Sequence, residues 1–457
     1  MTTTGTATLS RLFDARFVLM GVVLTLAPLI VFASRGEPPS VFGIPVEFLL
    51  FATTLLAVAL LHHRTLEVAL TGLAVITLYK LFVTGFHAGP GLPGLAAHLS
   101  HEWVVLTNLF GLLMGFALLS KHFEESRVPE VLPNYLADDW KGGLTLLAVV
   151  FVMSGFLDNI AAAIIGGTVA ASVFRGRVHI GYLAAIVAAS NAGGAGSVVG
   201  DTTTTMMWID GVSPLDVVHA YLAAAVSFAI FAVPAARVQH RHSPIVRDAP
   251  ADVTIDWTRV AIVVFILAAA IVTNVTVNLR FPEVSDSFPF LGAAVWIALV
   301  LASPLRSPDW SLLPSTAKGS LFLLSLVISA SMMPVEKLPV ASWQTALGLG
   351  FVSSVFDNIP LTKLALVQGG YDWGFLAFAV GFGGSMVWFG SSAGVALSNL
   401  FPETRSVGRW IRHGWPIIIG YVAGFLVMLL VIGWEAHTPH KAGRAGAEAP
   451  AIQVAPH

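Results

Sequence analysis

The chain of 457 residues contains no cysteine, and only 11% of its residues are charged. The lack of cysteine excludes disulfides, thiolate metal sites and cysteine nucleophiles within this sequence. Soluble domains carry about 25% charged residues, so the low charge argues against an ordinary soluble fold. The HExxH and phosphate-binding-loop motifs are also missing. We therefore expect neither enzyme activity nor a bound cofactor.

Hydrophobic residues are abundant instead, at 56% of the chain, and the mean hydropathy is +0.80. Apolar runs near the ~20 residues that a helix needs to cross a bilayer recur throughout, which predicts an all-α polytopic membrane protein. The run 17–33 is long and has no clear small-residue cleavage site, so it is interpreted as a retained helix. The candidate spans are residues 17–33, 44–61, 66–86, 103–120, 181–210, 219–238, 257–277, 288–303, 315–333, 372–400 and 413–433.

Two further apolar stretches, 143–174 and 341–370, are too long for one straight helix and too short for two crossings. Each carries an Asp-Asn pair near its middle, at Asp158-Asn159 and Asp357-Asn358. A re-entrant hairpin fits this length, so we expect about 11 transmembrane helices and two hairpins. With a cytoplasmic N-terminus, 17 of the 24 Lys and Arg residues lie inside and five outside, as the positive-inside rule requires. The charged segment 121–141 is then expected on the cytoplasmic surface.

Each predicted hairpin is followed by a glycine-rich interruption of a helix, within 181–210 and within 372–400. The two interruptions align without gaps: Gly193, Gly194 and Gly200 match Gly383, Gly384 and Gly390, Asp201 matches Ser391, and Thr202 matches Ser392. Residues 44–238 and 257–433 each hold five crossings, so the two copies must have opposite orientations. We predict an inverted repeat with an N-terminal segment 1–43, a cytoplasmic linker 239–256 and a disordered tail 434–457. Paired interrupted helices of this kind mark transporter binding sites.

The polar residues of these segments suit a small hard cation. Asp and Asn oxygens, threonine hydroxyls and free backbone carbonyls together form a shell that Na⁺ accepts. We therefore expect Na⁺ at Asp158, Asn159, Asp201 and Asp357. Lys363 lies at membrane depth, six residues after Asp357. It either neutralises Asp357 or another carboxylate of the ion site in a structural ion pair, or takes part in the transport cycle.

Four stretches carry a resemblance to a known family: "FLDNIAAAIIGG", "SNAGGAGSVVGDTTTTMMWIDG", "VFDNIPLTK" and "GFGGSMVWFGSSAGVALSN". Over residues 44–433 the chain resembles the ion transporter superfamily, and within it the NhaD-type sodium/proton antiporters. The resemblance implies dimers, a scaffold domain, and a mobile domain built from both hairpins and both broken helices. It also implies a bacterial inner membrane location. The ion-site residues implied by the matching motifs are Asp158, Asn159, Asn191, Asp201, Thr203, Thr204, Asp357, Asn358, Ser391, Ser392 and Asn399.

The superfamily leaves the cargo open. A buried carboxylate that titrates near neutral pH can hold either a proton or Na⁺, and this competition couples the two fluxes, so three acids favour Na⁺/H⁺ exchange. The alternatives are a Na⁺- or H⁺-coupled symporter of citrate or a dicarboxylate and an arsenite-type anion permease. Such an anion site would offer Ser, Thr, Asn and helix N-termini, and "WFGSSAG" has that character. The expected partners are small ions, lipids and a second copy of the chain, and no nucleic acid.

Overall fold

A computed structural model describes residues 39–437 except 62, 63, 88, 247–252, 282, 283, 285 and 286. The described chain is helical apart from one two-stranded antiparallel sheet, β1 (Ser40–Val41) with β2 (Ile44–Pro45), and a single isolated bridge between Phe86 and Gly89. Within the residues that the structure describes, six helical segments are long and apolar enough to cross a membrane, and six shorter apolar helices accompany them. The prediction of an all-α polytopic membrane protein is therefore confirmed.

Most predicted spans coincide with helices whose bounds differ from the expected ones by a few residues. Predicted span 17–33 and tail residues 438–457 lie outside the described residues. The helices outside the interrupted regions are α2 (Val46–Leu60), α3 (Thr65–Tyr79) with a π-turn (Lys80–Thr84), α4 (Gly91–Glu125), α10 (Leu215–Val218), α11 (Ala220–His242), α12 (Trp257–Arg280), α13 (Phe290–Ala302), α14 (Leu313–Ser331) and α19 (Val407–Val431).

Helix α4 is much longer than the predicted span 103–120, with 35 residues. Its first turns carry His98, His101 and Glu102, which lower the local hydropathy. For this reason the predicted span begins only at residue 103. Glu102 is nevertheless buried, because it faces other helices. At the other end α4 continues to Glu125, into the segment expected to lie on the surface, and is followed by short turns, α5 (Val128–Val131) and η2 (Leu132–Tyr135).

The interrupted stretches form four pairs of shorter helices. Stretch 143–174 gives α6 (Trp140–Ser154) and α7 (Asn159–Val173), and stretch 341–370 gives α15 (Trp343–Ser353) and α16 (Asn358–Gln368). Stretch 181–210 gives α8 (Ile180–Gly194) and α9 (Thr202–Ile209). Stretch 372–400 gives α17 (Trp373–Gly383), the turn η6 (Gly384–Met386) and α18 (Ser392–Leu400). How deeply each pair enters the membrane, and from which side, stays a prediction.

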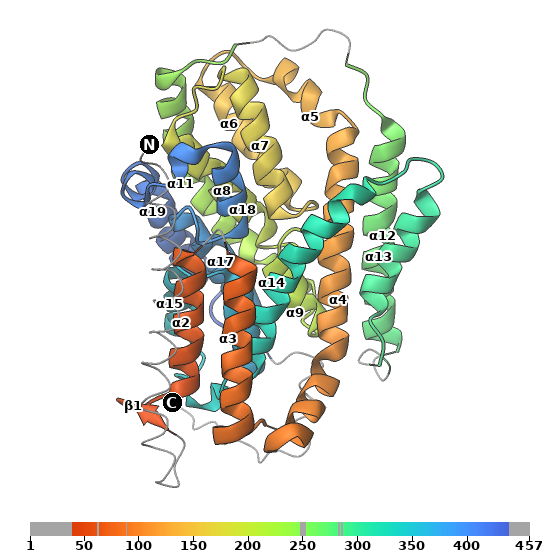
Figure 1. Cartoon of the computed structure of the whole chain (residues 1–457). Coiled ribbons are helices and arrows are strands. Elements are labelled where there is room, and N and C mark those ends of the chain that lie inside the picture. The colour runs from red at the N-terminus through yellow and green to blue at the C-terminus, as the bar shows by residue number, and fades with distance from the viewer. Residues whose placement is uncertain are drawn as a thin grey trace, which may run out of the picture.

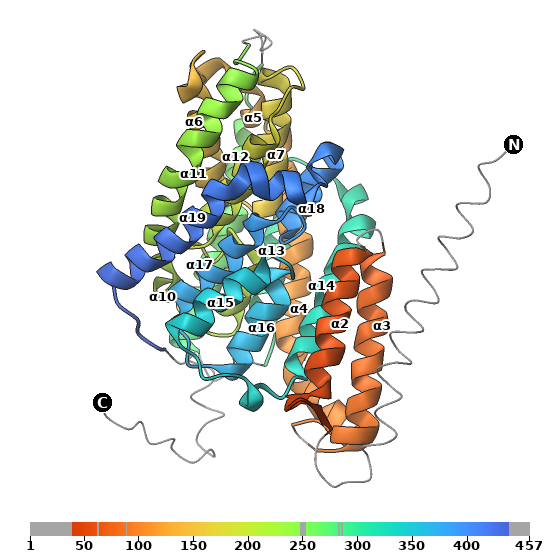
Figure 2. The same cartoon turned by 90° about the vertical axis from the view of Figure 1, so that its left-hand side faces the viewer.

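Two groups of helices face each other across the molecule. Helices α2, α3, α4 and α14 stand together on one side, while α11, α15, α17 and α19 occupy the other (Figure 2). In Figure 1, α4 runs through most of the height of the molecule, α6 and α7 lie toward the top, and α15 lies lower. The short helices α7, α9 and α16 contact α4 or α14, so the helix interruptions lie between the two groups.

Candidate functional site

Four short helices begin at one polar cluster. Asp158 is the N-cap of α7, Asp201 of α9, Asp357 of α16 and Ser391 of α18. Asp and Ser are favoured at this position because a side-chain oxygen can accept from the free N–H groups of the first turn. The helix starts also bring partial positive charge into the cluster.

Asp201 is the centre of the hydrogen-bond network. Asn159 Nδ2 donates to Asp201 Oδ1 at 3.0 Å and to Asn191 Oδ1 at 3.0 Å. Asn358 Nδ2 donates to Thr203 Oγ1 at 2.8 Å and, more weakly, to Asp201 Oδ1 at 3.5 Å. All five side chains belong to buried residues. Both Asp-Asn pairs, 199 residues apart in the chain, therefore converge on one carboxylate.

The second network joins α8 to the interruption between α17 and α18. Asn191 Nδ2 donates to Ser385 Oγ at 2.9 Å and to Ser391 Oγ at 3.1 Å. Ser385, a fully buried residue, was not among the expected site residues, although it lies two positions after the aligned Gly383. Sequence reasoning missed it because its counterpart in the first interruption is an alanine.

Asp357 has its own partners at the start of α16. Its Oδ1 accepts from the Ile359 N–H at 3.0 Å, and its Oδ2 accepts from Ser392 Oγ at 3.1 Å. Thr204 donates its hydroxyl to the backbone carbonyls of Ser197 and Asp201, as a threonine near a helix start commonly does. Asn399 belongs to α18, and its side chain lies outside the described part of the structure.

The predicted helix-break glycines allow close backbone packing. A Cβ at Gly193 would collide with the Phe151 carbonyl, and a Cβ at Gly383 would collide with the Gly350 carbonyl. Gly200 and Gly390 lie in the same way against the carbonyls of Ser154 and Ser354. Gly194 and Gly384 each approach the carbonyl oxygen of the glycine six residues later. The same contacts thus recur in the two aligned segments, and each requires a residue without a side chain.

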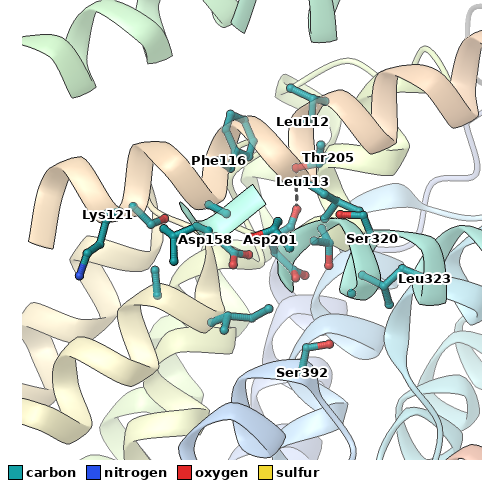
Figure 3. Close-up of a pocket in the computed structure, with 18 of the residues that line it drawn as sticks. Leu112, Leu113, Phe116, Lys121, Asp158, Asp201, Thr205, Ser320, Leu323 and Ser392 are labelled. Carbon is teal, nitrogen blue, oxygen red and sulfur yellow. Dashed lines mark hydrogen bonds between the residues drawn. The ribbon is translucent and has the colours of Figure 1, made fainter. Parts of the chain in front are cut away.

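A cavity of about 470 Å³ reaches this cluster from one side. Asp158, Asp201 and Ser392 line its polar part, and Leu113 and Phe116 of α4 cover them (Figure 3). The cavity extends along α4 to Lys121 and Glu124, whose side chains are 27% and 56% exposed. The cluster is therefore accessible from the C-terminal end of α4.

Lys363 pairs with Glu102, and not with Asp357. Its Nζ lies 2.9 Å from Glu102 Oε2 of α4, and the two side chains are 4% and 8% exposed. Asp210, at the end of α9, also interacts electrostatically with Lys363. Lys363 therefore does form a buried ion pair, but its partner is neither Asp357 nor another of the carboxylates expected at the ion site. The physical reason is direction: α16 starts at Asp357 and carries Lys363 more than a full turn away from it, toward α4.

Among the described residues, no group of three or more His, Asp and Glu side chains is arranged to hold a resident metal ion. Asp201 accepts from two asparagines and Asp357 accepts from Ser392, while Asp158 lines the adjoining cavity. Such a set provides oxygen ligands on several separate helices. A cation bound there would be surrounded by groups that belong to both hairpin-like pairs and to both interrupted helices.

The fold and the cluster have the features of a secondary transporter, in which polar groups at helix interruptions lie between two groups of helices. The sequence is 24% identical over 418 residues to sodium/proton antiporter 1 of Arabidopsis thaliana, covering 81% of this chain and 70% of the relative. It is 26% identical over 325 residues to sodium/proton antiporter 2 of the same plant, covering 62% and 74%.

A bacterial relative covers more of the chain. The Na⁺/H⁺ antiporter NhaD of Halomonas elongata is 24% identical over an alignment 475 positions long, which covers 91% of this chain and 94% of the relative. No family model matches the chain. The comparisons confirm the resemblance to NhaD-type sodium/proton antiporters. The names of these relatives are names of transporters and not of enzymes, as the sequence predicted.

Proposed function

We propose that this integral membrane protein exchanges Na⁺ or Li⁺ for H⁺ by alternating access. The observation that carries the proposal is the buried carboxylate of Asp201, which accepts hydrogen bonds from both Asp-Asn pairs. It is supported by the names of three relatives. A carboxylate at this place can neutralise either a proton or a cation, and the two ligands then compete for it.

The two sides of the cluster suggest which state the structure represents. The cavity connects Asp158 and Asp201 with the end of α4 at Lys121. On the other side the buried pair Lys363–Glu102 joins α16 to α4. In the proposed cycle the structure represents the state in which the cluster is open to the cytoplasm. The alternate state then requires the Lys363–Glu102 contact between α16 and α4 to change.

The orientation follows from the charge bias of the sequence. We propose 11 crossings, a cytoplasmic N-terminus, two hairpins that enter from opposite sides, and a homodimer in a bacterial inner membrane. Because the chain has no cysteine, a single Arg177→Cys or Val340→Cys substitution gives a unique label. An impermeant thiol reagent applied to whole cells should label Cys at 340 and not at 177. Labelling of both from one side would contradict the inverted repeat.

A coupled organic-anion symporter is the second candidate. It is favoured by the four helix N-termini and by Ser391 and Ser392, which suit a carboxylate ligand. Proteoliposomes separate the two candidates. An imposed Na⁺ gradient should move protons, as read by a pH-sensitive dye, without any added organic anion. Na⁺-dependent uptake of labelled citrate or succinate, with no proton movement, would replace the antiporter by the symporter.

A further inference from the structure

A second cavity lies between α2 and the pair α15–α16 and shares no lining residue with the cavity at the polar cluster. Its volume is about 350 Å³. One wall is a single face of α2, because its residues follow the helical spacing i, i+3, i+4 and i+7. They are Phe48, Phe51, Ala52 and Leu55. The opposite wall includes Leu361 and Leu364 of α16. We call this cavity the α2 groove.

The α2 groove is about as long as one leaflet of a bilayer is thick. Its α2 wall runs from Pro45 to Leu55, which is about 15 Å along a helix axis. The hydrocarbon core of both leaflets together is about 30 Å thick. Beside the groove, Phe42 and Val340 are exposed, and each is adjacent in the chain to a lining residue. Exposed apolar surface of this kind on an integral membrane protein indicates contact with lipid.

One cation lies at the mouth of the groove. Among the described residues that line it, Lys337 alone is charged. Lys337 belongs to the loop before α15, which lies near the β1–β2 turn at the start of α2 (Figure 2). Its ammonium forms no ion pair within the described part of the chain, and the adjacent Glu336 interacts electrostatically with Lys80 instead. The groove therefore combines an apolar interior with one unpaired positive charge.

We propose that the α2 groove binds one acyl chain of an anionic phospholipid, whose phosphate lies on the Lys337 ammonium. Lipid tails surround the groove and bury its apolar walls when they fill it. A lysine at the membrane surface attracts anionic headgroups, so it selects a lipid of net negative charge over a zwitterionic one. The site contains neither Asp158 nor Asp201, so this inference goes beyond the proposed exchange and does not depend on the cargo.

Two substitutions test the two parts of the site. Ala52→Phe fills the groove, and because Ala52 is exposed, the larger side chain displaces no buried residue. Lys337→Gln removes the positive charge. The matched controls are Ala74→Phe, at an exposed alanine of α3 outside both cavities, and Arg280→Gln, at the exposed end of α12. Native mass spectrometry of the full chain, titrated with phosphatidylglycerol or phosphatidylethanolamine of the same chain length, gives the affinity for the first bound lipid.

The unmodified protein should bind phosphatidylglycerol about 5-fold more tightly than phosphatidylethanolamine, and Lys337→Gln should lose this preference. Ala52→Phe should weaken the binding of both lipids about 15- to 60-fold, because about two or three methylene groups lose their burial. Neither control should change either affinity. Glycerol phosphate, which is the headgroup without chains, should not bind measurably. The measurement requires no ion exchange, so its result is separate from that of the proposed function.

Three results would overturn the inference. The first is unchanged lipid affinity in Ala52→Phe. If that variant instead melts at a lower temperature, another segment of this chain covers the groove, and if it loses the mass of a dimer, a second copy covers it. The second is a preference for phosphatidylglycerol that survives Lys337→Gln. The third is binding of glycerol phosphate as tight as that of the lipid, because the site would then need no acyl chain.

Discussion

The two helices that follow the Asp-Asn pairs differ most at one aligned position. Ile164 of α7 lies six residues after Asp158, and Lys363 of α16 lies six residues after Asp357. Ile164 borders the open cavity, whereas Lys363 is buried against Glu102. A cavity separates part of α7 from α4, whereas an ion pair joins α16 to α4. The same arrangement of helices can therefore border a cavity or be closed by an ion pair, depending on the side chain at this position and on its partner.

The contacts that build the framework do not share this difference. Ser154 donates to the Ser190 carbonyl and Ser353 donates to the Val380 carbonyl, at equivalent places in the two halves. Glycines pack against matching carbonyls in both halves. The backbone arrangement is thus nearly repeated. The asymmetry lies in two pairs of aligned side chains, Asp201 against Ser391 and Lys363 against Ile164.

The largest effect should come from removing the negative charge of Asp158 or of Asp357. Asp158→Asn and Asp357→Asn should each reduce Na⁺-driven proton movement in proteoliposomes to the level of empty liposomes. The amide keeps the shape and one oxygen, including an acceptor for Ser392 in the second case, but it cannot titrate or neutralise a cation. Asp216→Asn, outside the cluster, serves as the control. Full exchange by one of the two variants would mean that only one half of the repeat carries the ion.

Breaking the Lys363–Glu102 ion pair should give the next largest effect. Lys363→Ala strands the buried Glu102 carboxylate and should cost about 3–5 kcal/mol of unfolding free energy. Ile164→Ala, beside an existing cavity, should cost about 1 kcal/mol. Thermal unfolding in detergent measures both. If Glu102 is the true partner, Glu102→Gln should restore stability to Lys363→Ala, whereas Asp357→Asn should not. The opposite pattern of rescue would return the pairing to Asp357.

The sequence predicted much of this arrangement and missed the rest for identifiable reasons. Long apolar runs and glycines located the helices and their interruptions, because hydropathy and backbone freedom act locally. The two Asp-Asn pairs gave most of the polar cluster. Glu102 was missed because His98 and His101 beside it resemble a surface segment. Its partner Lys363 lies 261 residues later, and the two meet because α4 and α16 both pack against α14, which no local pattern encodes.

The smallest predicted effect tests whether the framework is as symmetric as its contacts. Ser154→Ala and Ser353→Ala each remove one buried hydrogen bond to a carbonyl, at 2.5 Å and 2.7 Å. Each should cost about 0.5–1.5 kcal/mol, and the two values should agree within the error of a thermal unfolding measurement. Na⁺ affinity should change little in both, because neither hydroxyl contacts the cluster. A much larger loss in one half would show that the symmetry of the contacts does not extend to their energies, and that Asp201 or Lys363 places strain on its own half.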